Sequence, residues 1–215
     1  MVKWLLIVLS CAYVAQLLLV NWLHIPVSGM LALTPGGLGL WQLATYVLVD
    51  LGDPIFFALG LLFLWWALTP FERAFGPTRT LQLCLVSTFG ASVPVYLVGL
   101  AIPSPPLFGA SALWFGAIAA TTWSQGDRQL SLFGLFSLSA RQFLWLVVGL
   151  LVLRFLANKD HTQLIAGLGA MGAGIGFVNW LRRPRGRRTP GRRTSARPSP
   201  FKVVKGGDDR PKWLN

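Results

Sequence analysis

Two polar residues at the beginnings of apolar segments carry side chains suited to nucleophilic chemistry. Ser111 follows Gly109-Ala110 after a proline-rich loop, so its hydroxyl is expected at the N-terminus of a short helix. Backbone N–H groups are exposed there and can receive an oxyanion, although a serine at this place can also act only as a helix cap. A hydroxyl needs a base before it can attack. Of the two histidines, His161 begins another apolar segment and is the better candidate, whereas His24 fits an interfacial position.

The segments that must position these residues have the composition of a membrane protein. Hydrophobic residues make up 54% of the 215 positions, and charged residues make up 12%, whereas a soluble domain has about 25% charged residues. Six apolar segments approach or reach the length of a membrane-spanning helix. They cover residues 4–23, 53–68, 80–102, 109–123, 143–156 and 164–181. The sequence therefore predicts an all-α, polytopic membrane protein with a six-transmembrane-helix bundle over residues 1–181.

The distribution of charge predicts the orientation of this bundle. The net charge is +12, and the tail of residues 182–215 holds 12 of the 19 basic residues. The remaining loop Lys and Arg gather mainly on the side of that tail, so the positive-inside rule puts both termini in the cytoplasm of a bacterial inner membrane. The tail is rich in Arg, Pro, Gly and Ser, which predicts disorder and attraction to anionic lipid head groups. Membrane attachment already accounts for the charge, so nucleic acid is not an expected partner.

Other features of the sequence bear on packing more than on chemistry. Cys11 and Cys84 stand alone in apolar segments, so we expect no disulfide framework, metal site or cofactor. The long connection between residues 24 and 52 is apolar and aromatic, and it is expected to lie in the outer membrane interface. Small residues recur at a spacing of four in segment 164–181, which lets a neighbouring helix approach closely.

With these residues in view, the chain resembles the rhomboid family of intramembrane serine proteases over residues 41–181. The resemblance rests on segments 41–46 and 60–65, on Glu72-Arg73 and Gly76, on Gly109-Ala110-Ser111 followed by Phe115 and Gly116, and on His161. It implies that Ser111 is the nucleophile and His161 the general base and acid. It also implies that Gly109 and Ala110 support the oxyanion, and that the remaining positions are structural.

The sequence departs from the family pattern around the expected oxyanion site. The second span of the family usually carries a histidine and, four residues later, an asparagine; the matching positions here are Phe56 and Gly60. Ala112 follows the serine where the family usually has glycine. The glycines expected three and seven residues after the histidine are Leu164 and Leu168. A second register would put Leu164 at the histidine position and leave the site inactive.

The resemblance implies two functions. The first is an intramembrane serine endopeptidase, without a cofactor, that cleaves the transmembrane segments of single-span membrane proteins with a Ser111–His161 dyad. The second is a rhomboid-like pseudoprotease that binds the helices of membrane proteins without cleaving them, which Phe56, Gly60 and the second register favour. A transporter or an unrelated bundle is a third alternative, and the scarcity of charges inside the spans argues against transport.

Overall fold

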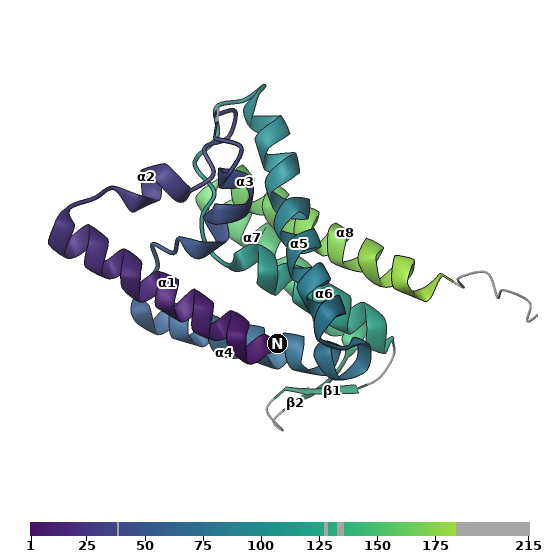
Figure 1. Cartoon of the computed structure of the whole chain (residues 1–215). Helices are drawn as coiled ribbons and strands as arrows, with labels where there is room; N and C mark the ends of the chain where they lie inside the picture. The colour runs from purple at the N-terminus through teal and green to yellow at the C-terminus, as the bar shows by residue number, and fades with distance from the viewer. Residues whose placement is uncertain (38, 127–128, 133–135, 184–215) are drawn as a thin grey trace, which may run out of the picture. The chain divides into compact units, whose positions relative to one another are not determined.

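The computed structural model describes residues 1–37, 39–126, 129–132 and 136–183 (Figure 1). Its first compact unit, Met1–Arg182, contains the six long helices, and the second is Arg183–Asn215. Nearly all of the tail that we predicted to be disordered and lipid-binding therefore lies outside the described residues. The long helices are α1 (Val2–Leu23), α4 (Pro54–Phe75), α5 (Pro77–Gly99), α6 (Ser111–Gln125), α7 (Ala140–Asn158) and α8 (His161–Arg182).

Five of these helices are long and apolar enough to cross a membrane. They are α1, α4, α5, α7 and α8, with 19 to 23 residues each. The sixth, α6, has 15 residues, nine of which are buried. It packs against α4, α5 and α8, so much of its surface is covered by protein. The main unit is a predominantly helical integral membrane protein, as predicted. Five helices of the described residues are long enough to cross a membrane, and the helix that corresponds to the fourth predicted span, α6, is shorter.

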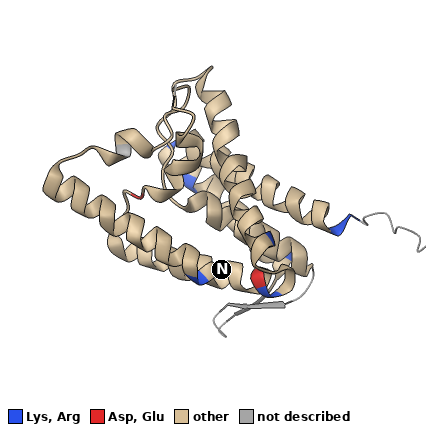
Figure 2. Ribbon diagram, viewed as in Figure 1, with Lys and Arg blue, Asp and Glu red and all other residues tan. Residues whose placement is uncertain are grey.

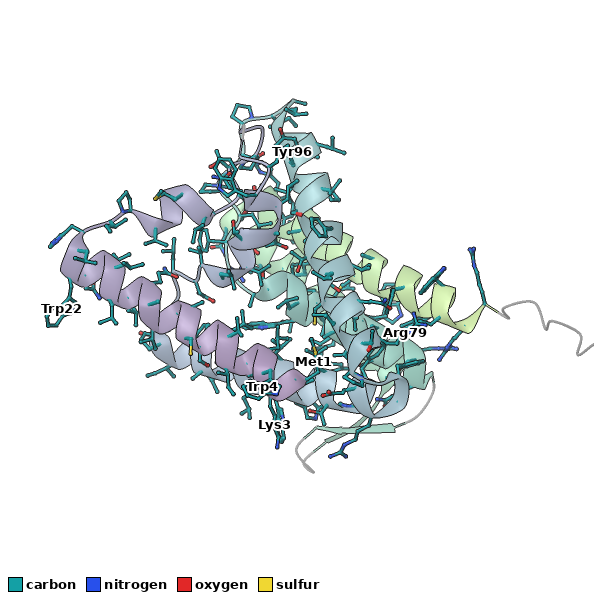
Figure 3. The ribbon with its side chains drawn as sticks, in the orientation of Figure 1. Met1, Lys3, Trp4, Trp22, Arg79 and Tyr96 are labelled. Atoms are coloured by element: carbon teal, nitrogen blue, oxygen red, sulfur yellow. The ribbon has the colours of Figure 1, made fainter. Side chains whose placement is uncertain are left out.

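Aromatic side chains mark both ends of α1. Trp4 and Trp22 are 72% and 80% exposed and project from opposite ends of the helix (Figure 3). Indole rings prefer the two membrane–water interfaces, where one edge is wet and the ring is apolar. The distance between these two residues along α1 therefore matches the distance between the two interfaces of a bilayer.

The predicted end of the second span needs correction. The second span was expected to end at Leu68 before Pro70, yet α4 continues through Pro70 to Phe75. Proline is tolerated inside membrane helices because neighbouring groups compensate for the lost hydrogen bond, and the Thr69 hydroxyl donates to the Trp65 carbonyl at 2.6 Å in this turn. The helix instead ends at Gly76, whose φ of 84° suits glycine.

The connection between α6 and α7 contains a short antiparallel hairpin that the sequence did not predict. Strands β1 (Gln129–Leu132) and β2 (Phe136–Ser139) pair with Gln129 opposite Ser139 and Leu132 opposite Phe136. Strands this short are easily missed in an apolar sequence, because their pattern resembles the helical segments beside them.

The centre of the bundle is closely packed because α8 meets α5 and α6 at glycines. A Cβ atom on Gly169 would lie 2.2 Å from the carbonyl oxygen of Gly90 on α5. A Cβ atom on Gly174 would lie 2.6 Å from the carbonyl oxygen of Gly116 on α6. The small-residue pattern of α8 thus allows backbone to contact backbone at two crossings, and these crossings fix the helix that begins at His161.

The long connection between α1 and α4 was predicted to lie in the membrane interface, yet part of it packs against the helical bundle. It contains α2 (Val27–Leu31), α3 (Gln42–Thr45) and a 3₁₀ helix, η1 (Tyr46–Leu48). Tyr46 is fully buried, and its hydroxyl donates to the Thr88 carbonyl of α5 at 3.0 Å. Burial raises the pKa of the Tyr46 phenol, so the group is a neutral donor.

Candidate functional site

Ser111 is the first residue of α6. The turn before it is formed by Gly109, which has a φ of 96° and whose N–H donates to the Tyr46 carbonyl at 3.1 Å. Ala110 is the N-cap residue, and the Ser111 hydroxyl caps no backbone group. The alternative that Ser111 serves as a helix cap is therefore wrong. Its hydroxyl lies at the positive end of α6, where first-turn N–H groups have no partner within the helix.

The hydrogen-bond partner of Ser111 is a residue that the sequence analysis missed. Ser111 Oγ donates to Gln163 Oε1 on α8 at 3.5 Å, which is at the outer limit of hydrogen-bond length. Gln163 is buried, and its backbone N–H is held by Asp160 Oδ1 at 3.2 Å. A carboxamide is neutral and cannot take up a proton near neutral pH, so Gln163 orients the hydroxyl without activating it.

His161 lies on the same helix but has another partner. Its Nε2 atom is 2.9 Å from Ser104 Oγ in the loop between α5 and α6. The Ser104 hydroxyl also lies 2.9 Å from the Ile102 carbonyl, to which it can donate its proton. The next residue, Thr162, donates to the Pro105 carbonyl at 3.2 Å. His161 and Thr162 thus hold this loop against the start of α8.

Helix geometry explains why Ser111 and His161 are not brought together. Successive residues of an α-helix are rotated by about 100°, so positions two apart lie on nearly opposite faces. When Gln163 faces α6, His161 therefore points away toward the loop. The two registers considered from the sequence put either His161 or Leu164 opposite Ser111. In the structure the residue opposite Ser111 is Gln163, which lies between them in the sequence. In this structure the predicted dyad is not formed, and its catalytic role stays a prediction.

The two positions expected to bind an oxyanion carry no suitable side-chain donor. Phe56 is 71% exposed at the start of α4. Gly60 is buried one turn later, and a Cβ atom there would lie only 1.8 Å from Cζ2 of Trp114. The indole of Trp114, which follows Ser111 by one helical turn, thus occupies the space that a side chain at position 60 needs. Its Nε1 atom is buried and has no hydrogen-bond partner among the residues that the structure describes.

A cavity of about 610 Å³ opens beside Ser111. Its wall is mostly apolar and aromatic, and it also carries two aspartates and an arginine. The lining includes Phe56 and Phe63 of α4, Trp114 of α6, Arg154 of α7, Gln163 of α8, and Asp50. Asp50 is fixed by Gln16 of α1, whose side chain donates to the Asp50 carbonyl at 2.9 Å and accepts from its N–H at 3.0 Å. The cavity therefore joins apolar surface to a few oriented polar groups, which is typical of a binding site.

The remaining predicted positions lie in packing contacts outside this cavity. Glu72 accepts hydrogen bonds from the Met1 ammonium at 2.6 Å and from the Val2 N–H at 3.1 Å. Arg73 is in the last turn of α4, where a cation interacts favourably with the helix dipole. Gly76 forms the turn between α4 and α5. Phe115 packs against the core, and Gly116 faces Ser87 of α5.

Fold and site together define a helical membrane protein with a serine at the N-terminus of its central helix, beside a cavity. A family model described as the Rhomboid domain matches residues 38–184. The chain belongs to the rhomboid family, which includes intramembrane proteases and related pseudoproteases, as the sequence resemblance predicted. A comparison with curated proteins gave no match.

Of the site residues that were not predicted, only Gln163 could have been recognised from the sequence. Gln163 is two positions from His161 and is followed by Ala166 and Ala170, three and seven residues later; both are fully buried. Small residues at this spacing indicate the register that the structure has, although glycine was the residue expected there. Ser104 and Gln16 gave no signal, because only the folded chain brings them to His161 and Asp50.

Proposed function

We propose that this protein is a rhomboid-like pseudoprotease that binds the transmembrane helices of single-span membrane proteins without cleaving them. One observation carries the proposal: the partner of Ser111 Oγ is the carboxamide of Gln163. Without a base, a serine hydroxyl remains a weak nucleophile. Two further observations support it, since His161 is hydrogen-bonded to Ser104 and Trp114 fills the space beside Gly60.

The proposed binding surface is the cavity beside Ser111. Phe56 and Phe63 are 71% and 38% exposed and belong to its wall. Exposed aromatic side chains offer a partner helix a large rigid contact area. Because Arg154 of α7 also lines the cavity, a partner helix can be received between α4 and α7.

The first prediction tests for the absence of catalysis. The wild-type protein and Ser111→Ala, purified in detergent, are expected to be equally unreactive toward a fluorophosphonate probe and toward a labelled transmembrane substrate. Both are expected to bind a non-cleaved fluorescent transmembrane peptide with the same affinity, measured by fluorescence anisotropy. Labelling or cleavage by the wild type that Ser111→Ala lacks would overturn the proposal.

A second prediction concerns the binding surface. Phe56→Ala is expected to weaken binding of the transmembrane peptide about tenfold, because removing an aromatic anchor commonly costs over 1 kcal/mol. Ile55→Ala is the matched control: Ile55 is adjacent and 70% exposed, yet it does not line the cavity. Equal effects of the two substitutions in the anisotropy measurement would show that the cavity is not the binding surface.

The second candidate function is the serine endopeptidase with Ser111 as nucleophile and His161 as base. It is favoured by the position of the Ser111 hydroxyl, which lines the cavity at the N-terminus of α6 and makes a long hydrogen bond to Gln163. This function needs α8 to turn so that His161 replaces Gln163. It predicts probe labelling that both Ser111→Ala and His161→Ala abolish.

The membrane orientation and the tail complete the proposal. With both termini in the cytoplasm of a bacterial inner membrane, the cavity opens toward the opposite side. The basic residues of the tail would then face anionic lipid head groups of the inner leaflet. The basic residues at the end of α8, visible in Figure 2, support this orientation.

A further inference from the structure

A second cavity, of about 250 Å³, lies where α6 and α8 end and α7 begins. It is therefore at the other end of α7 from Arg154 and is separate from the cavity beside Ser111. Three helices line it, with Trp123 and Gly126 from the end of α6, Ala140 and Arg141 from the start of α7, and Asn179 and Arg182 from the end of α8.

Two arginines from different helices give this cavity a positive charge. The described residues that line it include Arg141 and Arg182 and no acidic residue. Arg182 Nη2 donates to the Ser124 carbonyl at 2.6 Å, which fixes the guanidinium over the end of α6. A guanidinium has five N–H donors in a planar fork, and the hydrogen bond to Ser124 uses one of those of Arg182. Two such groups suit the oxygens of a phosphate.

The start of α7 adds to this positive field. Ser139 and Gln142 form a capping box at 3.3 and 3.1 Å, so the first turn of this 19-residue helix is well defined. Ala140 and Arg141, the first two helical residues, belong to the cavity wall. Their N–H groups lie at the positive end of the α7 dipole, which favours an anion. The ends of α6 and α8 present carbonyl groups instead, and Arg182 binds one of these, that of Ser124.

The surroundings of the cavity are those of the membrane interface. Trp123, in its wall, is 40% exposed, and its Nε1–H donates to Asn179 Oδ1 at 2.8 Å. Trp180, which follows Asn179 in α8, is 49% exposed. Half-exposed indoles are typical of the level of lipid head groups. Leu144 of α7 adds apolar wall beside the arginines, where an acyl chain would continue from a head group.

We propose that this cavity is a binding site for the phosphate group of an anionic phospholipid. Arg141 and Arg182 bind the phosphate oxygens, the start of α7 contributes backbone dipoles, and Trp123 and Leu144 contact the apolar part of the lipid. The site is formed by the bundle itself. The lining residues named here belong to α6, α7 and α8, and the site does not depend on whether Ser111 is catalytic.

The test uses the full chain in lipid nanodiscs and in detergent. Native mass spectrometry counts bound phosphatidylglycerol and gives its affinity, with phosphatidylcholine as the neutral lipid. We expect one saturable phosphatidylglycerol site that Arg141→Gln and Arg182→Gln each weaken about tenfold, as loss of a charge-assisted contact does. Arg182→Lys keeps the charge and loses the fork, so an intermediate affinity is expected.

Arg154→Gln is the matched control, because it removes the same charge from the same helix as Arg141→Gln, at its other end. It is expected to leave the affinity unchanged. Equal weakening by Arg154→Gln, or no preference over phosphatidylcholine, would overturn the proposal in favour of general charge attraction. Competition by millimolar inorganic phosphate or soluble glycerol phosphate would show a free-phosphate site and overturn the lipid assignment. Melting temperatures in phosphatidylcholine discs verify that each variant is folded. If Arg182→Gln does not fold, the affinity of Arg141→Gln for phosphatidylglycerol decides the test.

Discussion

Gln163→His is expected to make Ser111 reactive toward a fluorophosphonate probe. The substitution puts an imidazole at the position whose carboxamide oxygen is 3.5 Å from Ser111 Oγ in the wild type. A histidine there can accept the hydroxyl proton, and a positioned base contributes about 10²–10⁴-fold to such reactions. We therefore expect the labelling rate to rise at least about a hundredfold over that of the wild type, measured by in-gel fluorescence over time.

The controls for this gain of reactivity are specific. Adding Ser111→Ala to Gln163→His must remove the signal, and Gln163→Asn, which keeps an amide, must not produce one. Cleavage of a transmembrane substrate is expected to remain slow, because one missing oxyanion donor alone costs about 10²–10³-fold. If the wild type is labelled as fast as Gln163→His, Ser111 already has a base, and the pseudoprotease proposal fails.

Gly169→Ala is expected to destabilise the protein by about 1–3 kcal/mol, the usual cost of forcing extra atoms into a packed core. The added methyl would lie 2.2 Å from the Gly90 carbonyl oxygen, and a backbone atom cannot move aside without separating α5 from α8. The measurement is the free energy of unfolding in mixed micelles, from a titration with sodium dodecyl sulfate followed by tryptophan fluorescence.

Gly172→Ala serves as the control on the same helix. Nothing lies within 4 Å of a Cβ atom at this position, and alanine favours the helix over glycine by up to about 1 kcal/mol. We therefore expect the control to be neutral or stabilising. Equal destabilisation by both substitutions would mean that the close crossing of Gly90 and Gly169 does not determine stability.

The helices were largely predictable because a bilayer imposes a strong constraint on sequence. Runs of apolar residues predicted the spans. Both α4 and α5 continue past an internal proline, Pro70 and Pro94, and α4 ends where Gly76 adopts a positive φ. The hairpin of β1 and β2 was not predicted, because strands of four residues are too short to show a clear alternation of apolar and polar residues. The close crossings of α8 were anticipated from small residues at a spacing of four, although their partners Gly90 and Gly116 could not be assigned.

The site was less predictable, because it depends on the rotation of one helix. The position of Ser111 at the start of α6 was expected from Gly109 and the proline-rich loop. Successive residues of a helix are rotated by about 100° about its axis. The rotation of α8 about its axis therefore decides whether His161, Gln163 or Leu164 faces Ser111, and composition does not predict that rotation. Rotation is set by the backbone contacts of Gly169 and Gly174 with α5 and α6, which are visible only in the folded chain.

The contact between Gly60 and Trp114 determines the order in which substitutions at these two positions are tolerated. Any side chain at position 60 overlaps the indole ring, since even a Cβ atom would lie 1.8 Å from it. Gly60→Asn alone is therefore expected to be disruptive, whereas the same change after Trp114 has become smaller fills the vacated space. The two substitutions are therefore expected to be epistatic: an amide side chain at position 60, beside Ser111, requires a smaller residue at position 114 first.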